Sequence, residues 1–248
     1  MPRQLCGWVL AVGSGVIAVA LAGEAGCVFY DPIQVRAQTA GLVAPAGRRV
    51  YPRDESGTDP TFATFRSALL GAATRGDLAA LQEAIAATPT INFEPSTRER
   101  VSRRFNLRQG VPWRALRDAL TLGAVKEGTV DTFVAPYTSA SESALKGDEL
   151  IITARNVRVR QSPDSGSEVV EQLTYDVVTQ GANYHEFDAD LFERSDMPTG
   201  RSAWAHIVTL SGKQGYVYGR YVRSPIGRRF HFERQNGVWQ IAHVTAGD

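Results

Sequence analysis

The sequence has few of the residues on which disulfide bonds, metal sites and nucleophilic catalysis depend. Of its 248 residues, two are cysteines, at positions 6 and 27, and four are histidines. Because we expect Cys6 to be removed with an export signal, the mature chain has no internal disulfide, and its stability must come from packing. Cysteine-based metal sites are excluded on the same ground. We expect no cofactor.

An excess of charge of either sign is also lacking. Lysine and arginine total 27, aspartate and glutamate total 26, and the formal net charge is +1. Such a chain has no overall field to steer it toward nucleic acid or an acidic membrane, so we predict no nucleic-acid partner. Hydrophobic residues make up 43% of the sequence. This content is sufficient for the core of one large domain or two small ones.

Residues 1–26 have the pattern of a segment that directs a protein out of the cytoplasm. One early arginine precedes an uncharged apolar stretch from Leu5 to Ala22, with small residues near its end. This pattern predicts a cleaved signal peptide. A retained membrane anchor is the alternative, because about 18 apolar residues approach the length of a membrane span. A lipid on Cys27 is a further possible link to the membrane. We expect an exported protein of the periplasm or cell envelope.

Residues 27–58 contain several prolines and glycines with little periodicity, the composition of a flexible tether. A helical domain at 59–147 is predicted to follow it. Asp59 can cap a first helix, and glycine and aspartate at 76 and 77 separate it from a second helix that stops at Pro89. The two form a predicted helical hairpin.

The most basic stretch of the sequence, "STRERVSRRFNLRQG", lies within this helical domain. One interpretation is an anion-binding face, for which the candidate residues are Arg98, Arg100, Arg103 and Arg104. The other is the solvated flank of a helix. No glycine-rich loop or nucleic-acid motif accompanies the arginines, which favours the solvated flank.

From about residue 148 the hydrophobic period changes from helical to alternating. Four apolar runs, "LIITARNVRVR", "EVVEQLTYDVVTQ", "AWAHIVTL" and "GYVYGRYV", predict four short strands of a small β-barrel at 148–225. A polar stretch, "NYHEFDADLFERSDMPTGR", is interpreted as a long loop between them. At 226–248 the dipeptide Asn236-Gly237 predicts a closing β-hairpin, which could pack on the helical domain. The predicted fold class is α+β.

Several short motifs of the barrel segment occur in a characteristic order. They are Val159-Arg160, Pro163, Val169-Val170, Leu173, Trp204, Gly215-Tyr216-Val217 and Tyr221-Val222. In this order the segment resembles the bacterial SH3-like (SH3b) domain. With its helical and C-terminal flanks, the chain resembles uncharacterised exported bacterial SH3 domain proteins. The resemblance implies a small barrel, and binding of cell wall is known for some relatives.

The segment departs from the usual SH3b pattern at three places. Arg158 replaces the usual asparagine, Tyr175-Asp176 replaces a glycine, and Tyr216 replaces a tryptophan. These changes affect the choice of ligand more than the fold.

Aromatic residues are concentrated at "GKQGYVYGRYV", residues 212–222. In a strand, Val217 faces one side and Tyr216 and Tyr218 face the other, so these rings either complete a core or form a binding surface. The candidate ligand-binding residues are Tyr175, Trp204, Tyr218 and Tyr221. Aromatic grooves bind extended peptides in folds of this kind. The expected partner is a peptide, a peptidoglycan fragment or an envelope protein.

Catalytic and metal sites have weaker support. Residues 59–145 contain no histidine and no cysteine, which argues against a wall hydrolase. A glycosidase remains an alternative, because such enzymes use carboxylates and Asp77, Glu83 and Glu94 provide them. An acidic set in the polar loop lacks the spacing of an EF-hand; its members are Asp188, Asp190, Glu193 and Asp196. We therefore expect a non-enzymatic binding protein. The alternative is a structural protein that self-associates, with the arginines on an anionic surface.

Overall fold

The structure is a computed structural model that describes residues 48–105, 113–128, 131–195 and 197–245. The predicted export signal, Cys27 and most of the predicted tether lie outside these residues. Within the described ranges, no helix has the length and apolar character needed to cross a membrane. The chain folds as the predicted α+β class, with helices and two mostly antiparallel sheets.

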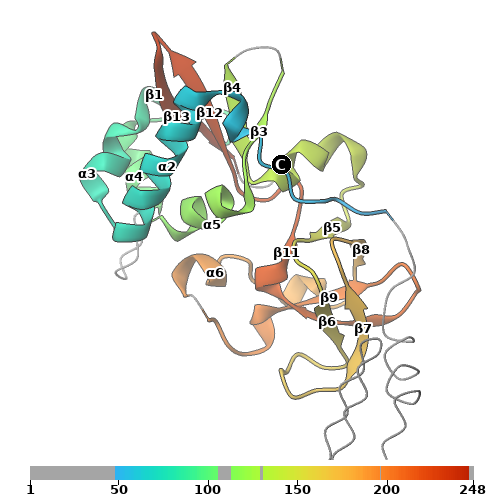
Figure 1. Cartoon of the computed structure of the whole chain (residues 1–248). Coiled ribbons are helices and arrows are strands. Elements are labelled where there is room, and N and C mark those ends of the chain that lie inside the picture. Colours follow the sequence, from blue (N-terminus) through green and yellow to red (C-terminus); the bar gives the residue numbers. More distant parts are fainter. Residues whose placement is uncertain (1–47, 106–112, 129–130, 196, 246–248) are drawn as a thin grey trace, which may run out of the picture. The chain divides into compact units, whose positions relative to one another are not determined.

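The first sheet has six strands in the order β2-β1-β13-β12-β4-β3 (Figure 1). All neighbours are antiparallel except β1 and β13, which run parallel. The strands are β1 (Ile85–Ile91), β2 (Glu94–Pro95), β3 (Val125–Lys126), β4 (Thr132–Ala135), β12 (Arg229–Gln235) and β13 (Val238–Thr245). The helices of this part are η1 (Ser56–Thr58), α2 (Pro60–Arg75), α3 (Leu78–Glu83), α4 (Arg98–Phe105), α5 (Arg114–Leu122) and η2 (Tyr137–Ala144).

Helix α2 begins and ends where the sequence predicts. The Asp59 carboxylate accepts hydrogen bonds from the amides of Thr61 and Phe62, and Pro60 occupies the first helical position, where a missing N–H costs nothing. Gly76 ends the helix with φ 70°, a left-handed conformation that glycine adopts readily.

The second predicted helix is wrong beyond Glu83. Helix α3 stops there, and residues 85–91 form β1, which pairs in parallel with β13. Thr88, Pro89 and Thr90 are poor helix formers, and a strand at this position gains a hydrogen-bonded neighbour from the C-terminal end of the chain. The predicted helical hairpin is therefore a helix pair followed by a strand.

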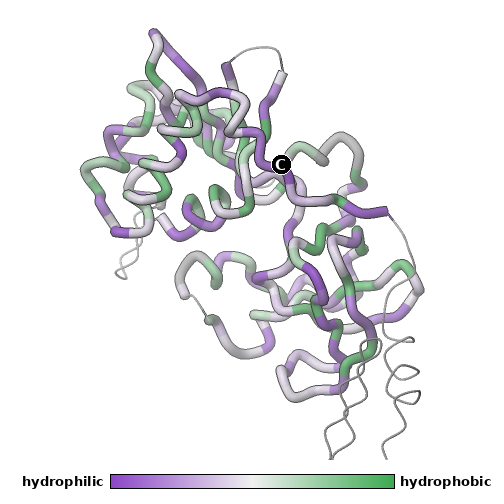
Figure 2. Tube along the Cα trace, in the orientation of Figure 1, coloured by the Kyte–Doolittle hydropathy of each residue, from purple (hydrophilic) through white to green (hydrophobic). Residues whose placement is uncertain are grey.

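The core of this part lies between α2 and the sheet. The Phe62 ring stacks on Phe133 with a centroid distance of 3.9 Å and meets Trp239 at 4.9 Å and Phe232 at 5.6 Å. All four residues are buried. Figure 2 shows hydrophobic and hydrophilic residues alternating along the strands. This alternation gives the sheet a face that packs against the helices.

The predicted C-terminal hairpin is present. Asn236 and Gly237 form its turn with φ 51° and 82°, the positive values that a two-residue turn between twisted strands requires. Its first strand, β12, pairs with β4, and Phe230 lies opposite Ala135. The chain between these two paired residues builds the second sheet, so the second sheet is an insertion within the first.

The second sheet has seven strands in the order β11-β5-β8-β9-β10-β6-β7. They are β5 (Glu149–Ile152), β6 (Val157–Arg160), β7 (Val169–Leu173), β8 (Val177–Gln180), β9 (Trp204–Val208), β10 (Gln214–Tyr218) and β11 (Val222–Arg223). The predicted number of strands was too small, because the chain turns at Asn156 and Tyr175, where φ is 55° and 60°. Each turn divides one apolar run into two strands, and the turn at residues 219–221 divides a third run into β10 and β11. No pairing among the described strands joins β7 to β11, so the hydrogen-bonded sheet is open rather than a closed barrel.

The long polar loop that was predicted before β9 contains regular structure. It holds η3 (Tyr184–Glu186), α6 (Leu191–Arg194) and η4 (Arg201–Ala203), and η5 (Gly219–Tyr221) follows β10. Phe192 of α6 is buried among aromatic residues of the second sheet. The interpretation as a loop without regular structure was wrong, because short helices form there and the apolar side chain of Phe192 packs against the sheet.

Residues 48–50, which lie within the segment 27–58 predicted to be a flexible tether, also contact the second sheet. The Arg49 guanidinium forms an ion pair with the buried Asp176 at 3.0 Å, and the Val50 amide donates to the Tyr175 carbonyl. The pKa of Arg49 is raised, mainly by its hydrogen bond to Asp176. These contacts fix the place where the described chain enters the fold.

We predict that Gly215→Ala destabilises the fold. A Cβ at this position would lie 2.6 Å from the Arg160 carbonyl oxygen and 2.7 Å from Val159 Cγ1. The backbone of β6 would have to move away, and overpacking of this kind costs about 1–3 kcal/mol. Urea unfolding of both proteins measures the difference. Gly57→Ala, where a Cβ would meet no atom within 4 Å and φ is not positive, is the control and should unfold close to the unaltered protein.

Candidate functional site

The second sheet has an ordered arrangement of rings across β9 and β10, on a face that Phe187, Leu191 and Phe192 partly cover. Tyr218 lies opposite Trp204, and Tyr216 lies opposite His206, while Val217 between the tyrosines is fully buried. The predicted division of the tyrosine-rich stretch into a core side and an outer side is confirmed. Cross-strand aromatic pairs of this kind stabilise the sheet and present flat surfaces outward.

Strand β6 continues the arrangement on the other side of β10. Tyr216 pairs with Arg160, and β6 alternates buried Val157 and Val159 with less buried Arg158 and Arg160. The antiparallel register therefore places Arg158 next to Tyr218 on the same face. Two rows of side chains therefore run across β9, β10 and β6. One row is Trp204, Tyr218 and Arg158, and the other is His206, Tyr216 and Arg160.

A groove of about 760 Å³ opens on this face. We call it the aromatic groove. It is lined by residues 155–158, 160, 163–165 and 197–200 and by Trp204, Tyr218 and Tyr221. Its volume lies in the range of sites that take small molecules or short peptides.

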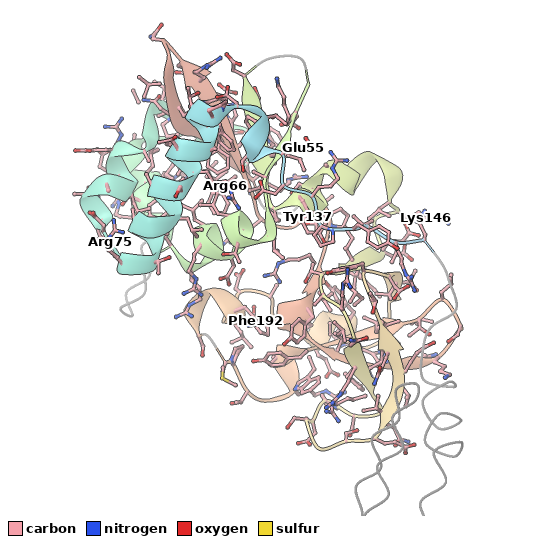
Figure 3. All side chains as sticks on the ribbon, viewed as in Figure 1. Glu55, Arg66, Arg75, Tyr137, Lys146 and Phe192 are labelled. Atoms are coloured by element: carbon pink, nitrogen blue, oxygen red, sulfur yellow. The ribbon has the colours of Figure 1, made fainter. Side chains whose placement is uncertain are left out.

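Tyr218 is held in place from several sides. Its hydroxyl donates to the Pro198 carbonyl at 2.9 Å, and its ring meets Trp204 at 5.4 Å and Phe192 at 5.2 Å, the last labelled in Figure 3. Burial raises the pKa of the Tyr218 hydroxyl, which keeps it protonated as a donor. Tyr218 thus connects the 197–200 segment to the sheet and is part of the fold as well as of the groove.

Three of the four candidate ligand-binding residues line the aromatic groove, and Tyr175 does not. Tyr221, with 39% of its surface exposed, is the most accessible of the three rings, whereas Trp204 is nearly buried. Tyr175 occupies the turn before β8 and packs edge-to-face against Tyr51 at 5.7 Å. The sequence did not indicate that Arg155, Arg158 and Arg160 would share the groove with the rings.

The candidate anion-binding arginines belong to α4 and do not line the aromatic groove. Arg98 Nε donates to the Ile85 carbonyl at 3.0 Å, so this side chain braces α4 against the start of β1. Arg100 and Arg103 are exposed. For Arg104 only the backbone is described. An anion-binding role for this set stays a prediction.

The histidines are used in local hydrogen bonds. On the first sheet, His243 Nδ1 bonds Thr90 Oγ1 at 2.9 Å and its Nε2 bonds Glu233 at 2.8 Å, while His231 bonds Glu127 at 3.0 Å. The hydroxyl, imidazole and carboxylate are connected in the order that a nucleophilic triad requires, but they lie along neighbouring strands and join β1, β12 and β13 to one another. We interpret them as cross-strand ties.

The remaining candidate ionisable residues are placed apart from the groove. Asp77 caps α3 by accepting from the Ala80 amide, Glu83 ends that helix and Glu94 lies in β2. Asp190 lies 3.7 Å from Arg228, Asp188 accepts from the Asp190 amide, and the side chain of Glu193 and all of Asp196 are outside the described set. Among the described residues, no group of three or more histidines, cysteines or carboxylates is arranged to hold a metal.

We predict a pH dependence of stability that is specific to His206. Burial, together with nearby Arg201, lowers the pKa of His206, and its neutral Nδ1 accepts from the Asn183 amide at 3.0 Å. As the pH falls below about 6.5, the unfolded chain binds a proton that the folded chain does not, so stability is lost. His206→Asn keeps an acceptor near this position but does not titrate. The drop in unfolding free energy from about pH 7.5 to about pH 5 should be smaller in the variant.

His231, whose pKa is also lowered by burial, is present in both proteins, so their difference reports on His206. Equal drops in the two proteins would show that His206 is not the titrating group. Urea unfolding at each pH provides the measurement.

Comparison of the chain with protein-family models, with curated proteins and with solved structures finds no match. The interpretation of the site therefore rests on its own chemistry: flat apolar rings beside guanidinium groups in an open groove.

Proposed function

We propose that this chain is a non-enzymatic binding protein of the cell envelope and that its second sheet is an SH3-like module for an extended peptide. The single observation that supports the proposal most is the aromatic groove, in which Trp204, Tyr218 and Tyr221 converge. Rings in an open groove suit an extended chain, because each ring offers a flat apolar surface at a small cost in conformational entropy. The sequence motifs that resemble SH3b domains support the same assignment, and so does the pattern of an export signal.

The test is co-sedimentation of the full chain with purified peptidoglycan, compared with Tyr221→Ala and Tyr51→Ala. Both tyrosines are exposed, at 39% and 57%, but only Tyr221 lines the groove. We expect Tyr221→Ala to weaken binding about 5- to 30-fold, the cost of truncating a contact residue that contributes 1–2 kcal/mol. Tyr51→Ala should bind as the unaltered chain does.

Circular dichroism on both variants verifies that the fold is retained. If Tyr221→Ala and Tyr51→Ala bind peptidoglycan equally well, the aromatic groove is not the binding site. Sedimentation without peptidoglycan that rises with protein concentration would instead favour the self-associating structural protein.

A further inference from the structure

We propose that the aromatic groove selects its ligand by charge: Arg155, Arg158 and Arg160 bind free carboxylates on the peptide part of peptidoglycan. The inference rests on the proposed function and deepens it, because it names the chemical group that a ligand of the same groove must carry. Nothing in the aromatic rings alone would make this choice.

The three guanidiniums are close together because of the local strand geometry. Arg158 and Arg160 are two residues apart on β6, so both side chains leave the sheet on the face opposite the buried Val157 and Val159. Arg155 lies just before this strand, ahead of the turn at Asn156. All three arginines line the aromatic groove with Trp204 and Tyr221.

The charges of these arginines are not neutralised within the described part of the chain. None of the three forms an ion pair there: Arg155 lies 5.8 Å from the Tyr175 ring, Arg160 donates to the Ser167 carbonyl, and Arg158 is exposed. One carboxylate, Asp164, also lines the groove, and it accepts from the Gly166 amide at 2.6 Å. The groove thus has three cationic groups and one anionic group.

The groove thus has a local excess of positive charge, whereas the whole chain has a net charge of only +1. At physiological ionic strength, charges are screened over about 8 Å, so a ligand in the groove responds mainly to these arginines. Guanidinium is planar, stays charged and matches the geometry of a carboxylate. A peptide that lays apolar atoms on the rings and directs carboxylates toward β6 uses both halves of the groove. The stem peptides of peptidoglycan are extended and carry free carboxylates.

The test distinguishes recognition of carboxylate charge from binding of peptidoglycan through uncharged contacts. The probes are untreated peptidoglycan and the same material after its carboxylates have been converted to amides, each sedimented with the full chain. We expect amidation to reduce binding about tenfold or more, as the loss of two or more partly exposed ion pairs would. Arg158→Gln should weaken binding to untreated material about three- to fivefold, Arg158→Glu should weaken it further, and neither should change binding to amidated material.

The matched controls are Arg75→Gln and Arg75→Glu, which alter an exposed arginine at the end of α2 outside the groove. Equal binding to untreated and amidated material would overturn charge recognition and leave the proposed function standing. Equal losses from the Arg75 and Arg158 variants would overturn it as well, because attraction would then be unspecific. No binding to either material would overturn both the proposed function and this inference.

Discussion

Phe62→Ala should destabilise the protein by about 3–5 kcal/mol, the cost of removing a large buried ring and leaving a cavity. Phe62 is fully buried and stacks on Phe133 at 3.9 Å, with Trp239 and Phe232 on its other sides. Since domains of this size are stable by only about 5–15 kcal/mol, the variant should be partly unfolded at moderate temperature. Urea unfolding followed by tryptophan fluorescence, with Trp239 beside the cavity, provides the measurement.

Phe93→Ala is the control for this experiment. The chemical change is the same, but 76% of the Phe93 surface is already exposed. We expect a change within about 0.5 kcal/mol, as for most surface substitutions. A loss from Phe62→Ala as small as that from Phe93→Ala would show that α2 does not pack on the sheet through this ring.

Trp204→Ala is expected to have a comparable effect on the second sheet, about 3–5 kcal/mol. Trp204 is 9% exposed, begins β9 and packs its ring against Tyr218 at 5.4 Å. The substitution removes ring packing that also positions Tyr218, so loss of binding by this variant alone would not distinguish the groove from the fold. Thermal unfolding monitored by near-ultraviolet circular dichroism measures the loss of stability.

Trp204→Phe resolves this ambiguity. It keeps an apolar ring in the packed position and removes the outer part of the indole, so the fold should persist while peptidoglycan binding weakens. Unchanged binding by a folded Trp204→Phe variant would place the contact surface on Tyr221 and the arginines rather than on the indole. If the Trp204→Ala variant unfolds at the same temperature as the unaltered protein, the proposed role of Trp204 in packing is contradicted.

Elements whose signals are local were predictable from the sequence. Helix α2 has its cap at Asp59 and its stop at Gly76, and the final hairpin has its turn at Asn236-Gly237. Residues 85–87 were predicted to continue the second helix, but they begin a strand whose partner, β13, lies far along the chain. Local propensity contains no information about such a partner.

The candidate site was predictable to a similar degree. Trp204 and Tyr218 belong to neighbouring strands, so their proximity follows from the register once the strands are known. Tyr175 was predicted to lie with them, but the positive φ at this residue turns the chain, and its ring packs against Tyr51. The alternation in "VRVR" already placed Arg158 and Arg160 on one face. Which other side chains share that face depends on β6 lying beside β10.

The parallel pair β1 and β13 has a consequence for the order in which the protein is made. The ribosome releases β1 early, and the two strands at the centre of the first sheet, β13 and β12, are the last described residues to emerge. All strands of the inserted sheet leave the ribosome before them. The later module therefore has every described residue it needs while the earlier one still lacks its centre, and Phe62 of α2 lacks its contacts with Phe232 and Trp239 until β12 and β13 emerge.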